Sequence, residues 1–402
     1  MATLPLVAAG LSGVALAILV GADGSMLWRS VRVVVVGAVT VTAVRTDVRW
    51  QRHAQFLLAL VATAAGVGIG LPHVVKTGLS IRAAAGLAAL VAGLLLLVAG
   101  AVRLWARLRS WRRLLVIPVA LVMLVFVLAP LSIAIAATNV PRTSIGSRTP
   151  ADLGMAYDDV VLQTSDGVDL AGWYVPSENG AAVVLLHGAG STRSATLDHA
   201  AVLARHGYGV VLLDARGHGE SGGRAMDFGW YGDDDVAAVV TFLERQPEID
   251  PQRIGAVGLS MGGEEAVGAA AALPGIRAVV AEGATGRTAA DKAWMSDVYG
   301  VRGWVQERIE WMTFSLTDLL TAADPPIALH DAVAVAAPRP VLLIAAGNVS
   351  DEADAARFIG SASPTTVEIW QVPDTGHTDG LTTHPEEWEA RVTTFLAEHL
   401  GP

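Results

Sequence analysis

The chain places a serine between two glycines at a point where an apolar run changes into an alanine-rich one. Ser260 lies at the centre of Gly258-Leu259-Ser260-Met261-Gly262, after IGAV and before EEAVGAAAAL. A tight turn from a strand into a helix raises the side chain at its apex, and the flanking glycines leave room for the neighbouring strand and helix. The sequence therefore predicts that Ser260 is a nucleophile that attacks an electrophilic carbon. The simpler alternative is a packing turn in a glycine-rich chain.

A serine hydroxyl reacts poorly unless a base accepts its proton. His377, in VPDTGHTDGL, follows the last strand-like run and is the candidate base. His187, in HGAG, precedes the nucleophile and is interpreted as a structural hydrogen-bonding residue. Six other histidines lie in predicted helices, in a turn or in an insertion, and are interpreted as structural: His199, His206, His218, His330, His384 and His399.

A carboxylate is needed to orient the imidazole. The stretch IAAGNVSDEADAARF follows the seventh strand-like run and offers Asp351, Glu352 and Asp354. We favour Asp351 because it is nearest the end of the strand and preserves the chain order serine, acid, histidine. Asp354 is expected in the first turn of the next helix. Glu282, which ends the preceding strand-like run, is a less favoured substitute.

These candidate residues lie at the ends of alternating strand-like and helix-like segments. Short apolar runs that are typical of strands buried on both faces are AAVVLLHG, GVVLLDARG, IGAVGLS, IRAVVAEG and PVLLIAAG. Helix-like segments separate them, which predicts an α/β fold with a doubly wound, mostly parallel sheet. An insertion over about residues 285–337 is rich in Trp and Met and is predicted to form a helical cap.

The first 137 residues are predicted to form a membrane region. Four uncharged apolar runs have about the length of a span: Leu4–Gly21, Ala54–Leu71, Ala83–Val102 and Leu114–Ala137. A cleaved signal peptide is the alternative for the first run. The stretch Val31–Val44 is short and β-branched, so a strand or hairpin on the membrane surface is at least as plausible as a fifth span.

Arginines predict the orientation of this region. They crowd into 29–52 and 103–113, whereas the other connections hold few basic residues. The positive-inside rule places the two arginine-rich segments in the cytoplasm and the C-terminal domain outside it, at the cell membrane. The predicted spans contain no charged residue, so the region is interpreted as an anchor. Residues 138–154 form a predicted linker, and 155–402 the C-terminal domain.

Composition excludes several classes of function. The net charge of -10 argues against nucleic acid as a partner, because neutralising phosphates requires a basic surface. The chain has no cysteine, and thus no disulfide, thiolate chemistry or cysteine-based metal site. The run Asp233, Asp234 and Asp235 is interpreted as favouring a helix N-terminus. We predict no metal and no cofactor.

Four motifs give residues 150–402 a family resemblance: LLHGAG, LLDARGHGESGG, VGLSMGG and VPDTGHTDG. The region resembles the α/β-hydrolase superfamily, particularly its prolyl-oligopeptidase-like and dienelactone-hydrolase-like serine hydrolases. The resemblance implies Ser260 as nucleophile, His377 as base, Asp351 as orienting acid, and the N–H groups of Ala189 and Met261 as oxyanion donors. Relatives commonly place the acid third after a strand-ending glycine, whereas Asp351 is fourth after Gly347.

The leading hypothesis is a membrane-anchored serine hydrolase that cleaves an ester, thioester or amide through an acyl-enzyme. Its predicted partners are the lipid bilayer and a small-molecule, acyl or peptide substrate. One alternative is a catalytically inactive hydrolase-like module that binds or scaffolds in the membrane. Another is a transporter regulated by its hydrolase domain, against which the uncharged spans argue. The bond type and the oligomeric state stay open at this point.

Overall fold

The computed structural model describes residues 3–21, 26–47 and 49–401. It divides the chain into two compact units. One comprises Met1–Pro141 and Ile309–Leu320, and the other comprises Arg142–Arg308 and Thr321–Pro402. The first boundary falls within the predicted linker 138–154, and residues 309–320 of the predicted cap belong to the first unit.

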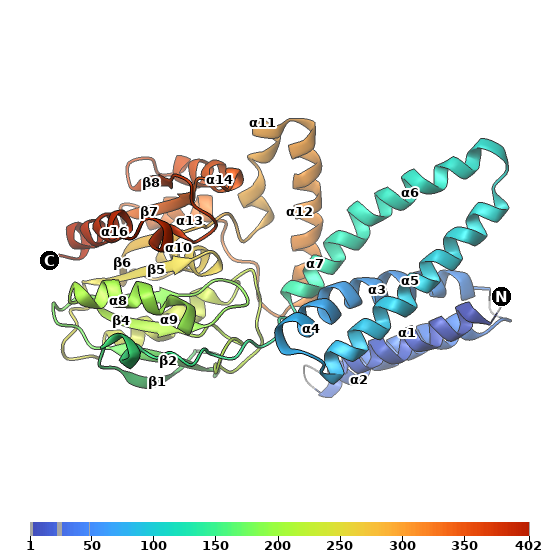
Figure 1. Cartoon of the computed structure of the whole chain (residues 1–402), viewed down its shortest axis with the longest axis horizontal. Helices are drawn as coiled ribbons and strands as arrows, with labels where there is room; N and C mark the ends of the chain where they lie inside the picture. The colour runs from blue at the N-terminus through green and yellow to red at the C-terminus, as the bar shows by residue number, and fades with distance from the viewer. Residues whose placement is uncertain (1–2, 22–25, 48, 402) are drawn as a thin grey trace. The chain divides into compact units, whose positions relative to one another are not determined.

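Helices make up the described part of the first unit (Figure 1). Their bounds are α1 Leu4–Val20, α2 Met26–Val44, α3 Gln51–Ala65, η1 Gly66–Gly70, α4 Leu71–Thr77, α5 Ile81–Arg107, η2 Ser110–Leu115, α6 Val116–Met123, η3 Leu124–Leu128 and α7 Ala129–Ala137. Four continuous helical stretches in the described residues are long and apolar enough to cross a membrane: Met26–Val44, Gln51–Thr77, Ile81–Arg107 and Trp111–Ala137. The shorter α1 is also apolar. These helices are compatible with membrane spans.

The structure corrects the interpretation of Val31–Val44, which lies within the helix α2 and forms neither strand nor hairpin. β-branched residues lower helix propensity by only tenths of a kcal/mol each. A helix satisfies the backbone hydrogen bonds of its interior within the segment, whereas an isolated hairpin leaves its edges unpaired. Most side chains of α2 are exposed, Val34 by 68%. An apolar helix with an exposed apolar surface suits a lipid environment.

The second unit is built on an eight-stranded sheet with the order β1-β2-β4-β3-β5-β6-β7-β8. Strands β3 to β8 pair in parallel, and β1 and β2 are antiparallel to their neighbours. The bounds are β1 Asp158–Gln163, β2 Asp169–Val175, β3 Ala182–Leu186, β4 Gly209–Leu213, β5 Ile254–Leu259, β6 Ile276–Glu282, β7 Val341–Ala346 and β8 Val367–Val372. The predicted α/β class with a mostly parallel sheet is confirmed.

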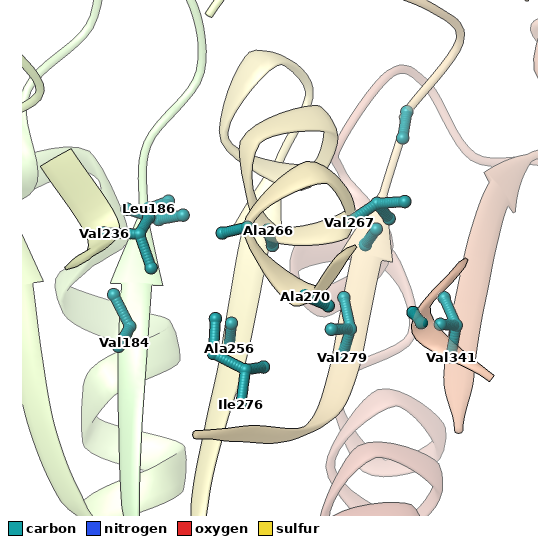
Figure 2. Packing of buried hydrophobic residues seen from close by; sticks show 14 of the residues in the cluster. Val184, Leu186, Val236, Ala256, Ala266, Val267, Ala270, Ile276, Val279 and Val341 are labelled. Atoms are coloured by element: carbon teal, nitrogen blue, oxygen red, sulfur yellow. The ribbon is translucent and has the colours of Figure 1, made fainter. Parts of the chain in front are cut away.

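Helices cover both faces of this sheet. One core joins the sheet to α9 Gly232–Leu243, α10 Met261–Ala272, α13 Leu329–Ala336 and α14 Ser350–Ser361. The other core joins it to α8 Leu197–Arg205 and α16 Pro385–Leu400. Burial on both faces explains why the central strands are apolar throughout. Figure 2 shows Ala266 and Ala270 of α10 among side chains of β3, β5 and β6, where small residues let the helix approach the sheet closely.

Shorter elements complete the second unit and the insertion after β6. They are η4 Pro150–Leu153, η5 Arg193–Thr196, η6 Ala289–Lys292, α11 Met295–Tyr299, α12 Val301–Leu320 and α15 Gly380–Thr383. Within the insertion, Trp294 and Met295, at the start of α11, pack against Ala355 of α14. The last helix of the insertion, α13, belongs to the helix layer over the sheet, because Leu329 and Val333 are fully buried in its core.

Candidate active site

The turn between β5 and α10 holds Ser260 in a conformation that side chains rarely adopt. Its backbone has φ 55° and ψ -119°, between the last residue of β5 and the first of α10. A positive φ at a non-glycine residue costs of the order of 1 kcal/mol or more and persists only where the surroundings enforce it. Here the Ser260 N–H donates to the Glu282 carbonyl at 2.7 Å, which ties the turn to β6. The strain is the consequence of raising the hydroxyl above the sheet.

The two glycines of the motif are required by close backbone contacts. A Cβ at Gly258 would lie 2.1 Å from the carbonyl oxygen of Gly262, and a Cβ at Gly262 would lie 2.6 Å from that of Leu186. Both distances are far below van der Waals contact, and backbone atoms on either side leave no room to adjust. The spacing in the sequence therefore reflects how tightly α10 packs on β5 and β3.

The structure brings Ser260 and His377 together, although 116 residues separate them in the chain. The Oγ of Ser260 lies 2.8 Å from Nε2 of His377, which stands in the loop after β8. The Nδ1 of His377 lies 2.6 Å from Oε1 of Glu352 in the first turn of α14. Since the carboxylate accepts at Nδ1, the proton of the neutral ring sits there. Nε2 is thus free to accept the proton of the serine hydroxyl.

The carboxylate that contacts His377 is Glu352, so the prediction of Asp351 at this position is wrong. Successive residues of a helix point about 100° apart, and Asp351 faces away from the imidazole. Its Oδ1 accepts a hydrogen bond from the Tyr299 hydroxyl at 2.7 Å. Glu352 is 1% exposed, and its Oε2 accepts from the N–H of Ala346, the last residue of β7, at 2.8 Å. The longer side chain of Glu352 reaches back to the end of β7, where both of its oxygens accept hydrogen bonds.

The other two carboxylates considered have separate roles. Asp354 forms an ion pair with Arg357 on the exposed side of α14. Glu282 is buried, and accepts hydrogen bonds from Gly380 N–H at 2.8 Å and Trp388 Nε1 at 2.9 Å. Glu282 thus anchors the segment that follows His377 and does not contact the imidazole ring through a hydrogen bond.

Electrostatics at His377 match this geometry. The hydrogen bond to Glu352 raises the pKa of His377 above its ordinary value of 6.5, and the charge of the same carboxylate adds to the effect. Partial burial opposes it by disfavouring the charged ring. A carboxylate in this position stabilises the imidazolium that forms when the ring accepts a proton.

The second unit is similar to a solved esterase structure. A solved esterase of Pyrococcus furiosus, Pf2001, is 28% identical, and the match covers 65% of this chain and all of that one with a TM-score of 0.51. The second unit has an α/β-hydrolase fold. The protein-family model described as serine aminopeptidase, S33, matches residues 177–332. Together with the named relatives below, these similarities support a hydrolase.

Curated relatives match a shorter stretch. An uncharacterised protein of Mycobacterium tuberculosis is 38% identical over 119 residues, which is 29% of this chain and 42% of that protein. A thiohydrolase of Aspergillus aculeatus is 39% identical over 118 residues, 28% of this chain and 37% of the thiohydrolase. The chain thus spans about two fifths of the length of these relatives.

The loop after β3 in the α/β-hydrolase unit is fixed on both sides of Ala189. His187 donates from Nδ1 to the Gly188 carbonyl at 2.8 Å and accepts at Nε2 from the Ala215 N–H at 3.1 Å. Burial lowers the pKa of His187 to about 3, so its ring stays neutral. The Gly190 N–H donates to Asp227 at 3.0 Å. A trans peptide directs its C=O and N–H to opposite sides, so holding the Gly188 carbonyl also sets the direction of the Ala189 N–H.

The start of the second unit joins this loop. The Thr143 hydroxyl donates to the Gly190 carbonyl at 3.0 Å, and the Gly146 N–H donates to Ser194 at 2.9 Å. Residues of the predicted linker are therefore bound along the hydrolase unit. The sequence offered no signal for this, because the stretch contains only the Pro, Gly and polar residues that are typical of a tether.

The acidic run at the start of α9 is engaged by arginines. Asp233 pairs with the fully buried Arg287 at 2.9 Å, and Asp235 pairs with Arg216 at 2.9 Å. Among the described residues, no group of three His, Asp or Glu side chains is arranged to hold a metal ion.

Proposed function

We propose that the chain is a membrane-anchored serine hydrolase that cleaves its substrate through an acyl-enzyme on Ser260. The observation that carries the proposal is the continuous series of hydrogen bonds from Ser260 Oγ to His377 Nε2 and from His377 Nδ1 to Glu352. Nucleophile, base and orienting acid are linked in the order that acyl transfer requires. Glu352 replaces Asp351 as the proposed acid.

In the proposed reaction, Ser260 Oγ attacks the carbonyl carbon of the substrate while His377 Nε2 accepts the hydroxyl proton. The negative charge on the carbonyl oxygen is stabilised by the N–H groups of Met261, at the start of α10, and Ala189. When the tetrahedral intermediate collapses, His377 gives the proton to the leaving group. A water molecule then attacks the acyl-enzyme with His377 again as base, which releases the acid and restores Ser260.

Oxygen and sulfur esters are the substrates that we favour over amides. The Pyrococcus furiosus neighbour is described as an esterase and the Aspergillus relative as a thiohydrolase. The serine aminopeptidase family model keeps an amide bond as the alternative. The Trp and Met content of the insertion favours an apolar acyl group.

The membrane is the second element of the proposal. The apolar helices of the first unit, α2 included, are compatible with spans. By the positive-inside rule, the arginine-rich segment 45–52 after α2 and the segment 103–113 would both lie in the cytoplasm. The hydrolase unit then faces the opposite side of the cell membrane. Bulk negative charge gives no basis for nucleic acid as a partner.

A fluorophosphonate probe tests the proposal, because it forms a covalent bond only with an activated serine. The full-length protein in membranes is compared with Ser260→Ala and His377→Ala. We expect labelling of the wild type, none in the Ser260 variant, and a sharp decrease in the His377 variant. A folded wild-type protein that takes up no probe would instead support a non-catalytic binding module.

The pH dependence of ester hydrolysis follows from His377. The ring must be neutral to accept the serine proton, and Glu352 raises its pKa above 6.5. We therefore expect kcat/KM to rise with pH and to reach half its plateau above pH 6.5. A pH–rate profile of the full-length protein in detergent micelles measures this midpoint. A midpoint at or below 6.5 would show that the carboxylate does not stabilise the imidazolium in the free enzyme.

A further inference from the structure

The helical unit contains a cavity that the hydrolase reaction does not use. It measures about 570 Å³ and lies between α3, α5, α6 and η3, within Met1–Pro141. Along α5 its lining runs from Leu94 to Arg107, which at 1.5 Å per residue is about 20 Å. This is about two thirds of the ~30 Å thickness of a bilayer's hydrocarbon core. The cavity is therefore long enough for an acyl chain of one leaflet, and its volume is in the range of ligand sites.

Its lining changes character from one end to the other. Leu60, Leu97, Val119 and Met123 are among the apolar side chains that form most of the wall. Arg52, Arg103 and Arg107 line one end, where α3 begins and α5 ends. An apolar channel with a basic mouth is complementary to a molecule with an anionic head and a hydrocarbon tail.

The basic end is held in place by a buried polar contact. Arg103 Nη1 donates to Gln55 Oε1 at 3.0 Å, and Gln55 Nε2 donates to the Ala43 carbonyl of α2 at 3.0 Å. Gln55 is 6% exposed, so these bonds fix Arg103 against three helices. This guanidinium is thus positioned before any ligand arrives.

No carboxylate among residues 3–21, 26–47 and 49–401 pairs with these arginines. The sequence has no Asp or Glu between Asp47 and Asp152, and Asp47 pairs with Arg45. In the described part of the chain, no ion pair joins Arg52, Arg103 or Arg107 to an acidic side chain. The three cations at one end of the apolar cavity therefore have no acidic partner among the described residues, which favours an anionic ligand.

The helix α6 has few contacts with the other helices that the structure describes. It follows α5 through the short η2 segment and runs antiparallel to it (Figure 1). None of its residues is buried, and Ile117 and Val119 are 57% and 54% exposed. A hydrocarbon chain in the cavity would contact α6 on one side and α3 and α5 on the other.

We propose that this cavity binds an anionic glycerophospholipid, with its phosphate at Arg52, Arg103 and Arg107 and an acyl chain between α5 and α6. Basic pockets between membrane helices on the cytoplasmic side bind anionic headgroups, and the orientation proposed above places this end there. The inference rests on the membrane anchoring in the proposed function and is independent of the hydrolase chemistry.

Native mass spectrometry of the full-length protein, released from detergent, tests the site with phosphatidylglycerol and phosphatidylcholine as probes. We expect phosphatidylglycerol to bind at least tenfold more tightly. Each basic residue near the surface contributes about fivefold, so Arg52→Gln with Arg107→Gln is expected to weaken that binding tenfold or more. Ala120→Phe, which adds bulk to the apolar wall and keeps every charge, is also expected to weaken it.

The matched control is Arg109→Gln with Arg112→Gln. Both arginines are exposed and follow Arg107 closely in the chain, but neither lines the cavity. We expect less than a threefold change. An equal loss of affinity for phosphatidylglycerol in both pairs of variants would overturn the proposed site and indicate diffuse electrostatic attraction. Equal affinity for the two phospholipids would also overturn it and indicate binding as bulk lipid. Displacement of phosphatidylglycerol by equimolar oleate would overturn the choice of a phospholipid. Fluorophosphonate labelling of the same samples is expected to be unchanged, which separates this proposal from the hydrolase.

Discussion

Replacement of Ser260 by alanine is expected to lower kcat for ester hydrolysis by a factor of about 10⁵ to 10⁶. The reason is that the variant has no nucleophile, so His377 and Glu352 have no proton transfer to assist. Removal of the serine from comparable triads costs about as much as removal of all three residues. What remains is the stabilisation of the oxyanion by backbone N–H groups. Initial rates with p-nitrophenyl butyrate and full-length protein in micelles measure the loss.

Ser350→Ala is the matched control for this prediction. Ser350 is the first residue of α14, is exposed, and directly precedes Asp351 and Glu352 in the chain. We expect its kcat to stay within twofold of the wild type. A Ser260 variant that kept more than a hundredth of the wild-type rate would mean that another group attacks the substrate, and the proposed mechanism would be wrong.

The contact between Ser260 and His377 could be expected from the sequence, because the position of each depends on local features of the chain. The turn between β5 and α10 has no space for a Cβ at Gly258 or Gly262, so the two glycines of the motif indicate it directly. The loop after the last strand is short, which restricts the positions that its histidine can occupy. In both cases, the residues that decide the geometry lie within a few positions of the functional side chain.

The carboxylate that contacts His377 was not predicted, because the carboxylate that faces the imidazole depends on how α14 is rotated about its axis. Asp351, Glu352 and Asp354 all lie within the first turn and a half of α14. Which of them faces the imidazole is set by the burial of Ala353, Ala356 and Ile359 against the sheet. That packing depends on distant residues. Proximity to the strand end favoured Asp351, whereas the longer side chain of Glu352 reaches back to Ala346.

The helix α2 shows a second limit of reasoning from residue type. Its valines suggested a strand, since β-branched residues are enriched in sheets. The difference in propensity is small, so the surroundings of this segment determine that it is a helix. The helix α2 packs beside α1 and α3, and its remaining surface is apolar and exposed. The apolar strands of the hydrolase unit, in contrast, were predicted correctly because burial on both faces leaves a uniform pattern in the sequence.

Glu352→Gln is expected to lower kcat by about 10⁴, whereas Asp351→Asn is expected to leave it within threefold. Both oxygens of Glu352 accept hydrogen bonds, one from His377 Nδ1 and one from the Ala346 N–H. A glutamine has a single oxygen for these two donors. If that oxygen stays with Ala346, the amide N–H₂ faces Nδ1 and forces the ring proton onto Nε2. The ring then donates to Ser260 and is no longer able to accept its proton, which is the effect that costs about 10⁴ in a comparable triad.

Asp351→Asn keeps the size of the side chain and its place in the first turn of α14, and changes the hydrogen bonds that Asp351 accepts from the hydroxyls of Tyr299 and Ser350. The pair of variants therefore separates the two neighbouring carboxylates by function. Steady-state kinetics at a pH on the plateau gives both values, and thermal unfolding shows whether either variant has lost its fold. A loss of 10⁴ in the Asp351 variant with a small change in the Glu352 variant would restore the assignment made from the sequence. It would also require α14 to rotate during catalysis, because in this structure only Glu352 of the two reaches the imidazole.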